Sequence, residues 1–214
     1  MGRWVIVANA PWRWQPWSVQ LLRAAAGVVA ADGGANHLAR IGVRPTAVVG
    51  DLDSIRAGAR AWIGEERLVL RSDQEHTDLH KTLAYLVDEL QVRRALVLAA
   101  TGGYQDHALE ALGVVARWAP QGSFELVDER CRIVPVLGRR VFATWPGQVV
   151  SLLPWGRCEG VRTAGLRWGL VGEPLDLMER TGVSNRAAGR RVVVEVSSGT
   201  LLVFLHRAEG PGKR

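Results

Sequence analysis

Asp51 and Asp53 lie two residues apart, directly after the apolar run Ala47–Val49, which is typical of a buried strand. In extended backbone, carboxylates at this spacing project to the same side and repel each other. A hard divalent cation such as Mg²⁺, shared with a polyphosphate, relieves that repulsion. Taken alone, the pair also fits a solvated acidic turn, or a helix N-cap at Asp53 or Ser54.

Further polar clusters follow other apolar, strand-like runs in the first half of the chain. They are residues 31–36, 73–81, 101–103 and 106–107. In a doubly wound α/β sheet, such strand ends lie on one edge, where ligands bind. We therefore expect a single crevice that gathers Asp32, Asp51, Asp53, Asp78 and Asp106.

Two glycine pairs, Gly33-Gly34 and Gly102-Gly103, also follow strand-like runs. Glycine lets backbone N–H groups approach phosphate oxygens closely, although two ordinary tight turns would use the same residues. The chain has no Walker-type phosphate loop and no Gly-x-Gly-x-x-Gly motif. Carboxylates that converge beside a lysine nevertheless fit Mg²⁺-assisted transfer from a nucleotide.

Lys81 is one of only two lysines among 27 basic residues, and the other, Lys213, lies near the C-terminus. Its position three residues after Asp78 favours a specific role over a generic surface charge. Histidines also occur near the clusters, but they lack a consistent ligand spacing for zinc: His37, His76, His80 and His107. Magnesium is therefore the expected metal.

The elements that must position these residues alternate between strand and helix. Expected strands are Trp4–Val7, Val28–Ala31, Ala47–Val49, Leu68–Leu70, Ala95–Ala100 and Phe124–Val127. Expected helices are Ser18–Ala26 with Ser18 as its cap, Asn36–Ile41, one starting at Thr77 or Asp78, and Leu109–Trp118. The third helix has an apolar stripe of Leu79, Leu83, Leu86, Val87 and Leu90, and Asp78 and Lys81 lie off that stripe. This pattern predicts an α/β domain over residues 1–130 with a mostly parallel, Rossmann-like sheet.

From about Cys131 the pattern changes to short β-prone runs separated by turns. The runs are Arg139–Thr144, Gln148–Leu153, Gly160–Ala164, Arg190–Val196 and Thr200–His206. No long helix is evident among them. We therefore predict a small antiparallel β-sandwich or barrel over residues 138–208, with the boundary near 129–138.

Composition excludes several classes of protein. With 48% hydrophobic and 22% charged residues the chain is globular, and no apolar stretch approaches the length of a membrane span. The net charge of +6 comes from arginines scattered through the second half, without a nucleic-acid-binding motif. Cys131 and Cys158 lack metal-type spacing, which favours free thiols and a cytoplasmic protein.

An ordered set of motifs resembles the thiamine pyrophosphokinase (thiamine diphosphokinase) family. In the first half these are Asp32-Gly33-Gly34-Ala35-Asn36, Gly50-Asp51-Leu52-Asp53-Ser54, Asp73-Gln74 with Thr77-Asp78 and Lys81, and Thr101-Gly102-Gly103 with Asp106-His107. In the second half, residues 163–168 and Ser184-Asn185 look like the family's late motifs. The resemblance implies an α/β nucleotide domain joined to a thiamine-binding β domain, in a homodimer with its site near the subunit interface. It also implies transfer of the terminal diphosphate of ATP to the thiamine hydroxyl, with release of AMP.

Carried over by motif, the resemblance assigns roles to individual residues. Asp51, Asp53 and Asp78, with Asp106, would hold Mg²⁺ and the ATP phosphates. Lys81 would neutralise phosphate charge. The remaining ATP contacts would come from Asp32, Gly33, Gly34, Asn36, Gln74, Thr77, Gly102 and Gly103. Ser184 and Asn185 would lie beside thiamine, contributed by the partner subunit.

The chain departs from the family pattern at four positions. Tyr104 stands where the family usually has a basic residue, and Ala111 where it has Asn. Arg186 and Ala187 replace an acidic residue and an aromatic one after Ser184-Asn185. These departures leave open a diphosphokinase for another alcohol, such as a hydroxymethyl pterin. A non-catalytic sensor of nucleotide or thiamine diphosphate is the alternative of a different class.

Overall fold

The computed structural model describes residues 2–207, so residue 208 and Lys213 lie outside it. The chain divides into two compact units. Unit 1 comprises the residues up to Val114 together with Gln121–Asp128, and unit 2 comprises Val115–Pro120 and the residues from Glu129 onward. Among the residues described, no helix is long and apolar enough to cross a membrane.

Unit 1 is built on a parallel sheet, as the sequence predicts. Its strands are β1 (Trp4–Val7), β2 (Gly27–Ala31), β3 (Ala47–Gly50), β4 (Leu68–Leu70), β5 (Arg94–Leu98) and β6 (Ser123–Val127). They follow the spatial order β6-β5-β1-β2-β3-β4, with every neighbouring pair parallel. All residues of β2 and β3 are buried, because helices cover both faces of the sheet.

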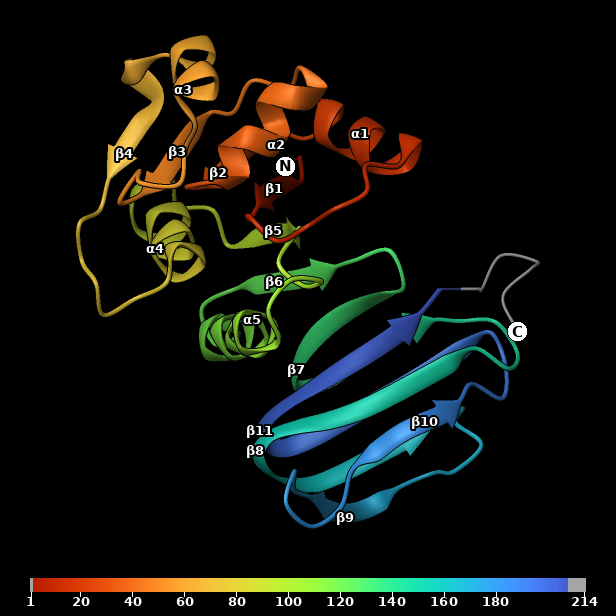
Figure 1. Ribbon diagram of the computed structural model, residues 1–214. Coiled ribbons are helices and arrows are strands. Elements are labelled where there is room, and N and C mark those ends of the chain that lie inside the picture. Colours follow the sequence, from red (N-terminus) through yellow and green to blue (C-terminus); the bar gives the residue numbers. More distant parts are fainter. Residues whose placement is uncertain (1, 208–214) are drawn as a thin grey trace. The chain divides into compact units, whose positions relative to one another are not determined.

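The helices of unit 1 lie on both faces of this sheet. They are α1 (Pro16–Arg23), α2 (Gly34–Ile41), α3 (Ala57–Ile63), α4 (Asp78–Ala84) and α5 (Gln105–Trp118), with a short 3₁₀ turn at Glu65–Arg67; the residues of α5 from Val115 onward belong to unit 2. Helices α1 to α3 lie on one side of the sheet and α4 lies on the other (Figure 1). The winding reverses between β1 and β5, which makes their carboxyl ends the topological switch point of the sheet.

Helix α1 begins two residues earlier than predicted. Pro16 occupies the first helical position, and Gln15 is the N-cap. The Ser18 hydroxyl accepts a hydrogen bond from the Gln15 backbone N–H at 3.1 Å and donates one to the Gln15 carbonyl at 2.9 Å. Ser18 therefore supports the cap from inside the first turn. Helix α3 was not predicted, because only Ala59 and Ile63 of its seven residues are buried.

Helix α4 confirms the predicted start and the predicted apolar stripe. Thr77 is its N-cap, and Leu79, Leu83, Leu86 and Val87 are all buried, whereas Leu90 is half-buried. The helix packs against β2 and β3 and ends in a π-helical turn over Tyr85–Glu89. This packing fixes the start of α4 beside the carboxyl ends of those two strands.

Unit 2 consists of antiparallel strands, as predicted, but with fewer and longer strands at its centre. They are β7 (Cys131–Ala143), β8 (Val149–Ala164), β9 (Val171–Leu175), β10 (Gly182–Arg186) and β11 (Arg191–His206). The order is β10-β8-β11-β7, and β9 also pairs with β8. Each of β8 and β11 replaces two of the expected strands. The turn-like residues that were expected to separate those strands form register shifts within one continuous strand. The exposed strands β9 and β10 were missed because they lack a continuous apolar face.

Candidate active site

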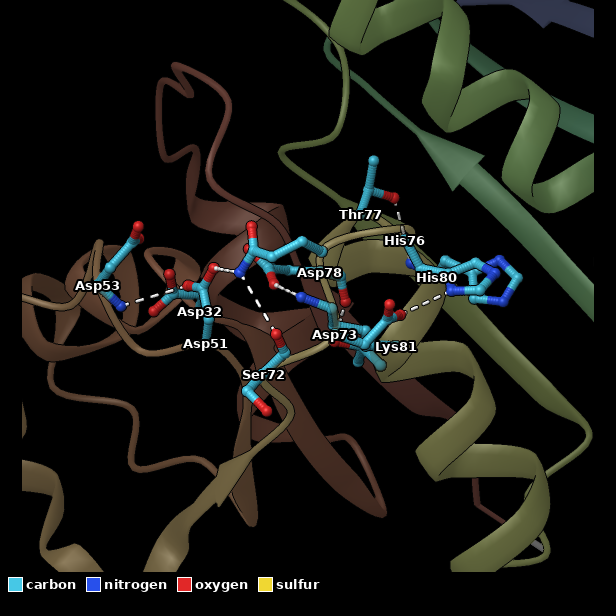
Figure 2. A network of polar contacts seen from close by, with 12 residues as sticks. Asp32, Asp51, Asp53, Ser72, Asp73, His76, Thr77, Asp78, His80 and Lys81 are labelled. Atoms are coloured by element: carbon cyan, nitrogen blue, oxygen red, sulfur yellow. Dashed lines mark hydrogen bonds and ion pairs between the residues drawn. The ribbon is translucent and has the colours of Figure 1, made fainter.

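Three carboxylates meet at the carboxyl edge of the parallel sheet. Asp32 follows β2, Asp51 follows β3, and Asp78 is the first residue of α4. One carboxylate oxygen from each lies within 4.8 Å of the others (Figure 2). We call these three residues the acidic triad. The parallel topology brings the ends of β2 and β3 together, and the packing of α4 against both strands places Asp78 beside them.

Gly50, the last residue of β3, allows the acidic triad to close. A Cβ atom at this position would lie 2.7 Å from the Asp32 Cβ and 3.0 Å from the Asp78 Oδ1. Both approaches are too short for a side chain to be accommodated without movement. The sequence showed only that a glycine opens a turn here, whereas its role is to let two carboxylates approach.

Asp32 is the most buried member of the triad, with 1% of its surface exposed. Its Oδ2 accepts a hydrogen bond from the Ser54 backbone N–H at 3.0 Å, whereas Oδ1 is buried without a partner among residues 2–207. Burial, helped by the charges of Asp78, Asp51 and Asp53, outweighs the lowering effect of the Ser54 bond and raises the pKa of Asp32 to about 6. An ionised Asp32 thus lacks the compensation that a bound cation would supply.

Asp51 and Asp78 have opposite shifts in pKa. Gln74 Nε2 donates to Asp51 Oδ2 at 3.2 Å, and this bond contributes most to a lowered pKa of Asp51. Burial raises the pKa of Asp78, although the neighbouring Lys81 ammonium opposes that change. Gln74, which the motif comparison assigned to ATP, therefore also orients a carboxylate of the triad.

Lys81 is buried, with 6% of its surface exposed, although it lies off the apolar stripe of α4. Its Nζ lies 3.3 Å from Asp78 Oδ1. The burial was not evident from helical periodicity, because it arises where α4 covers the ends of β2 and β3. A buried ammonium beside clustered carboxylates is suited to contact both the protein and a phosphate.

Asp53 and Asp106 lie outside the acidic triad. Extended backbone was expected from Asp51 to Asp53, but the chain turns at Leu52, which has a φ of +67°. The Asp53 side chain is consequently exposed and points away from Asp51 (Figure 2). Asp106 lies at the start of α5, where its Oδ1 accepts a hydrogen bond from the His107 backbone N–H at 2.9 Å.

The glycine pairs bring loops together at the same sheet edge. A Cβ on Gly34 would lie 2.0 Å from the Val7 carbonyl oxygen, and one on Gly33 would collide with the Asn9 side chain. Gly102 has a φ of +104°, and Gly103 packs against Pro11. Close packing thus accounts for Gly33, Gly34 and Gly103, and left-handed backbone accounts for Gly102.

Asn36 connects α2 to the segment that follows the triad residue Asp51. Its Nδ2 donates to the Ser54 carbonyl at 2.9 Å, and its Oδ1 accepts from the Arg56 N–H at 2.9 Å. Because Ser54 also donates to Asp32, this side chain holds the segment against the acidic triad. Thr77 caps α4 at the start of the same site.

Left-handed backbone in non-glycine residues occurs next to several of these positions, and also at Gln91 before β5. Asp32 and Ala99, directly after β2 and β5, have φ values of +37° and +54°, and Leu52, two residues after β3, has a φ of +67°. In unit 2, Ser184 has a φ of +63°. Such conformations cost about 1–3 kcal/mol each in non-glycine residues and gather at functional sites. The residue types gave no signal of this strain.

In unit 2, Asn185 is buried, and both its amide oxygen and its amide nitrogen form hydrogen bonds. Its Oδ1 accepts from the backbone N–H groups of Trp168 and Arg186 at 3.2 and 2.8 Å, and its Nδ2 donates to the Trp168 carbonyl at 2.7 Å. Asn185 therefore positions the exposed Trp168, over whose ring the Arg167 guanidinium lies at 5.0 Å. Ser184 is exposed beside it, and its N–H donates to the Ser151 hydroxyl at 3.0 Å.

The acidic triad fits a magnesium ion. Its ligands are all carboxylate oxygens, which Mg²⁺ prefers, and no histidine or cysteine belongs to the group. The buried and unpartnered Oδ1 of Asp32 supplies a lone pair that the described protein atoms do not use. Asp32, Asp51 and Asp78 are thus the residues that could hold the metal.

A parallel α/β unit with clustered carboxylates and a buried lysine at its carboxyl edge is typical of metal-dependent phosphotransferases. Comparison with protein families is more specific. The family described as "Thiamin pyrophosphokinase, catalytic domain" matches residues 19–126, and "Thiamin pyrophosphokinase, vitamin B1 binding domain" matches residues 140–201. The chain belongs to the thiamin pyrophosphokinase family and carries both of its domains.

Individual relatives agree with this assignment. The chain is 25% identical over 206 residues to thiamine pyrophosphokinase 3 of Oryza sativa subsp. japonica, covering 82% of this chain and 76% of the relative. Its fold is similar to thiamin pyrophosphokinase from Candida albicans, with a TM-score of 0.82, 17% identity, and coverage of 97% and 89%. It is also similar to thiamine pyrophosphokinase from Bacillus subtilis, with a TM-score of 0.81, 19% identity, and coverage of 97% and 100%.

Proposed function

We propose that the protein is a thiamine diphosphokinase that uses ATP and Mg²⁺. Family membership supports the class of reaction, and the acidic triad with its buried lysine is the observation that carries the proposal. In this reaction the thiamine hydroxyl oxygen attacks the β-phosphorus of ATP. The bond between the β-phosphorus and the bridging oxygen to the α-phosphorus breaks, AMP leaves, and the hydroxyl proton is released.

The chain's own residues would act mainly by positioning and charge. Mg²⁺, when bound, would neutralise phosphate charge. Asp32, Asp51 and Asp78 would hold it, and Gln74 keeps the Asp51 carboxylate oriented through their hydrogen bond. Lys81 would place its ammonium against the transferred phosphates while Asp78 anchors it. Phosphoryl transfer depends largely on such positioning and electrostatic stabilisation.

The residues outside the acidic triad are proposed to complete the nucleotide site. Because Mg²⁺ commonly retains several waters, Asp53 and Asp106 would contribute through water-mediated contacts. The backbone of the two glycine pairs and Thr77 would face the phosphates. In unit 2, Ser184 and Trp168 are the exposed groups available to thiamine, with Asn185 orienting Trp168.

We further propose that the working enzyme is a homodimer in which each site takes Ser184 from the partner. Light scattering coupled to size-exclusion chromatography would test this, since a monomer at assay concentration would contradict it. Cys131 and Cys158 are both buried and form no disulfide within residues 2–207, which supports a reducing compartment such as the cytoplasm.

The proposed activity can be tested by incubating the purified protein with ATP, Mg²⁺ and thiamine, and quantifying nucleotides and thiamine esters by chromatography. We expect AMP and thiamine diphosphate in equal amounts. A parallel reaction with a hydroxymethyl pterin tests the other alcohol, and AMP formed there but not with thiamine would overturn the assignment. Tight binding of either ligand without turnover would indicate a sensor.

A further inference from the structure

Unit 1 contains a pocket that none of the triad residues lines, although one lining residue, Asn36, is among those that the motif comparison assigned to ATP. It has a volume of about 630 Å³ and lies along α2 and α3, next to the loop that follows β1. We call it the basic pocket. Its polar lining comes from Asn9, Asn36, His37, Arg40 and Arg56. The volume falls within the range of about 300–1,000 Å³ that is typical of small-molecule sites.

The basic pocket carries positive charge without internal compensation. No carboxylate lines it. Arg40 and Arg56 are exposed, and neither guanidinium has a hydrogen bond or ion pair to another group in the described part of the chain. Burial lowers the pKa of the His37 imidazole, and the charges of these two arginines lower it further. An anion placed in the pocket would therefore be attracted by two guanidinium groups at once.

The lining of the basic pocket is held in place by contacts that do not involve the guanidinium groups. His37 Nε2 lies 3.1 Å from the Ala10 carbonyl oxygen, and the His37 ring packs edge-on against Trp14 at 5.8 Å. The Asn36 side-chain oxygen Oδ1 accepts a hydrogen bond from the Arg56 backbone N–H, which fixes the start of α3 against α2. A preorganised lining of this kind lowers the entropic cost of binding.

We propose that the basic pocket binds a small phosphorylated molecule at a site separate from the acidic triad. Planar guanidinium forks match phosphate oxygens in two-point contacts, and the amide of Asn9 adds a further donor. The two sites differ in whether they require a bound cation to attract a phosphate. The triad repels a phosphate unless a cation is bound, whereas the basic pocket attracts it directly. Phosphate binding in the pocket is therefore independent of divalent metal.

Calorimetric titration of the full chain with inorganic pyrophosphate in EDTA tests the binding. We expect one site per chain, and the double variant Arg40→Gln, Arg56→Gln should bind about tenfold or more weakly. Arg23→Gln is the matched control, since it removes an exposed arginine on α1 that does not line the pocket. Its affinity should equal that of the unchanged chain. Absence of binding, or equal loss in the control, would overturn the proposal.

Two further measurements locate the bound pyrophosphate. The pKa of His37, followed by NMR in the unchanged protein, should rise on addition of pyrophosphate, because a nearby anion favours the imidazolium. Heat of binding without any response of His37 would place the anion elsewhere and refute the assignment. Pyrophosphate should still bind when Mg²⁺ and a non-hydrolysable ATP analogue are saturating. Competition between them would make the pocket part of the nucleotide site and would overturn its separateness. None of these measurements depends on turnover, so they are independent of the proposed kinase activity.

Discussion

Replacing Asp32 by Asn should stabilise the metal-free protein at about pH 8. Burial, supported by the neighbouring carboxylates, raises the pKa of Asp32 from 3.8 to about 6 in the folded chain. Holding the carboxylate ionised in the folded state therefore costs free energy relative to the unfolded chain. A difference of about two pKa units corresponds to a cost on the order of 3 kcal/mol. Asn retains an oxygen that can accept the hydrogen bond from Ser54.

The direction of the pH dependence follows from the raised pKa. The folded state binds the Asp32 proton more tightly than the unfolded state does. The stability that this proton contributes is fully present below about pH 4 and is lost as the pH rises through about 6. The advantage of Asp32→Asn over the unchanged protein should accordingly be large at about pH 8 and small at about pH 4.

Urea unfolding in EDTA at these two pH values, followed by circular dichroism, would measure the difference. Asp88→Asn is the matched control, because Asp88 is exposed and lies outside the acidic triad. Added Mg²⁺ should stabilise the unchanged protein more than the Asp32 variant. If Asp32→Asn is less stable than the unchanged protein at about pH 8 in EDTA, or gains equally at both pH values, the described electrostatics of Asp32 are wrong.

Three further substitutions test individual contacts. Gly50→Ala should weaken Mg²⁺ binding measured by calorimetry and cost about 1–3 kcal/mol of stability, because the new Cβ would lie 2.7 Å from the Asp32 Cβ. Gly58→Ala is the control, because a Cβ at Gly58 would meet no atom within 4 Å. Equal behaviour of the two variants would contradict the close packing described at Gly50. Lys81→Arg should lower kcat/KM about tenfold or more, because the wider guanidinium would displace the phosphates beside Asp78. Unchanged kinetics would mean that Lys81 serves only as a structural ion-pair partner of Asp78. Asn185→Ala should destabilise unit 2 by about 1–3 kcal/mol and raise the KM for thiamine, because Trp168 loses two hydrogen bonds; an unaltered unfolding curve would exclude this positioning role.

Local sequence patterns were sufficient to predict much of the fold. The apolar stripe of α4 and its start at Thr77 or Asp78 depend on near neighbours in sequence, and both were predicted correctly. Of the five carboxylates expected at the sheet edge, Asp32, Asp51 and Asp78 converge, whereas Asp53 and Asp106 lie outside this group. The long strands β8 and β11 were split in the prediction, because their turn-like residues form register shifts inside a continuous ladder.

The site features that were not predicted from the sequence depend on tertiary packing or on an unfavourable backbone conformation. The left-handed φ at Leu52, which turns Asp53 outward, contradicts the ordinary preference of leucine, so no local rule would predict it. The burial of Lys81 and the need for glycine at position 50 both arise from close approach between α4, β2 and β3. The basic pocket joins residues from α2, α3 and the loop after β1, and their relation appears only in three dimensions.

The proposed role of the acidic triad is tested most directly by turnover of Asp51→Asn. Asp51 is partly exposed, so the substitution should leave the circular dichroism spectrum and the fold unchanged. At saturating ATP, thiamine and Mg²⁺, we expect formation of AMP and thiamine diphosphate to fall about 100-fold or more, equivalent to roughly 2.7 kcal/mol of transition-state stabilisation. Asp88→Asn should retain the full rate. Turnover by Asp51→Asn at the unchanged rate would contradict the assignment of the triad as the reaction centre.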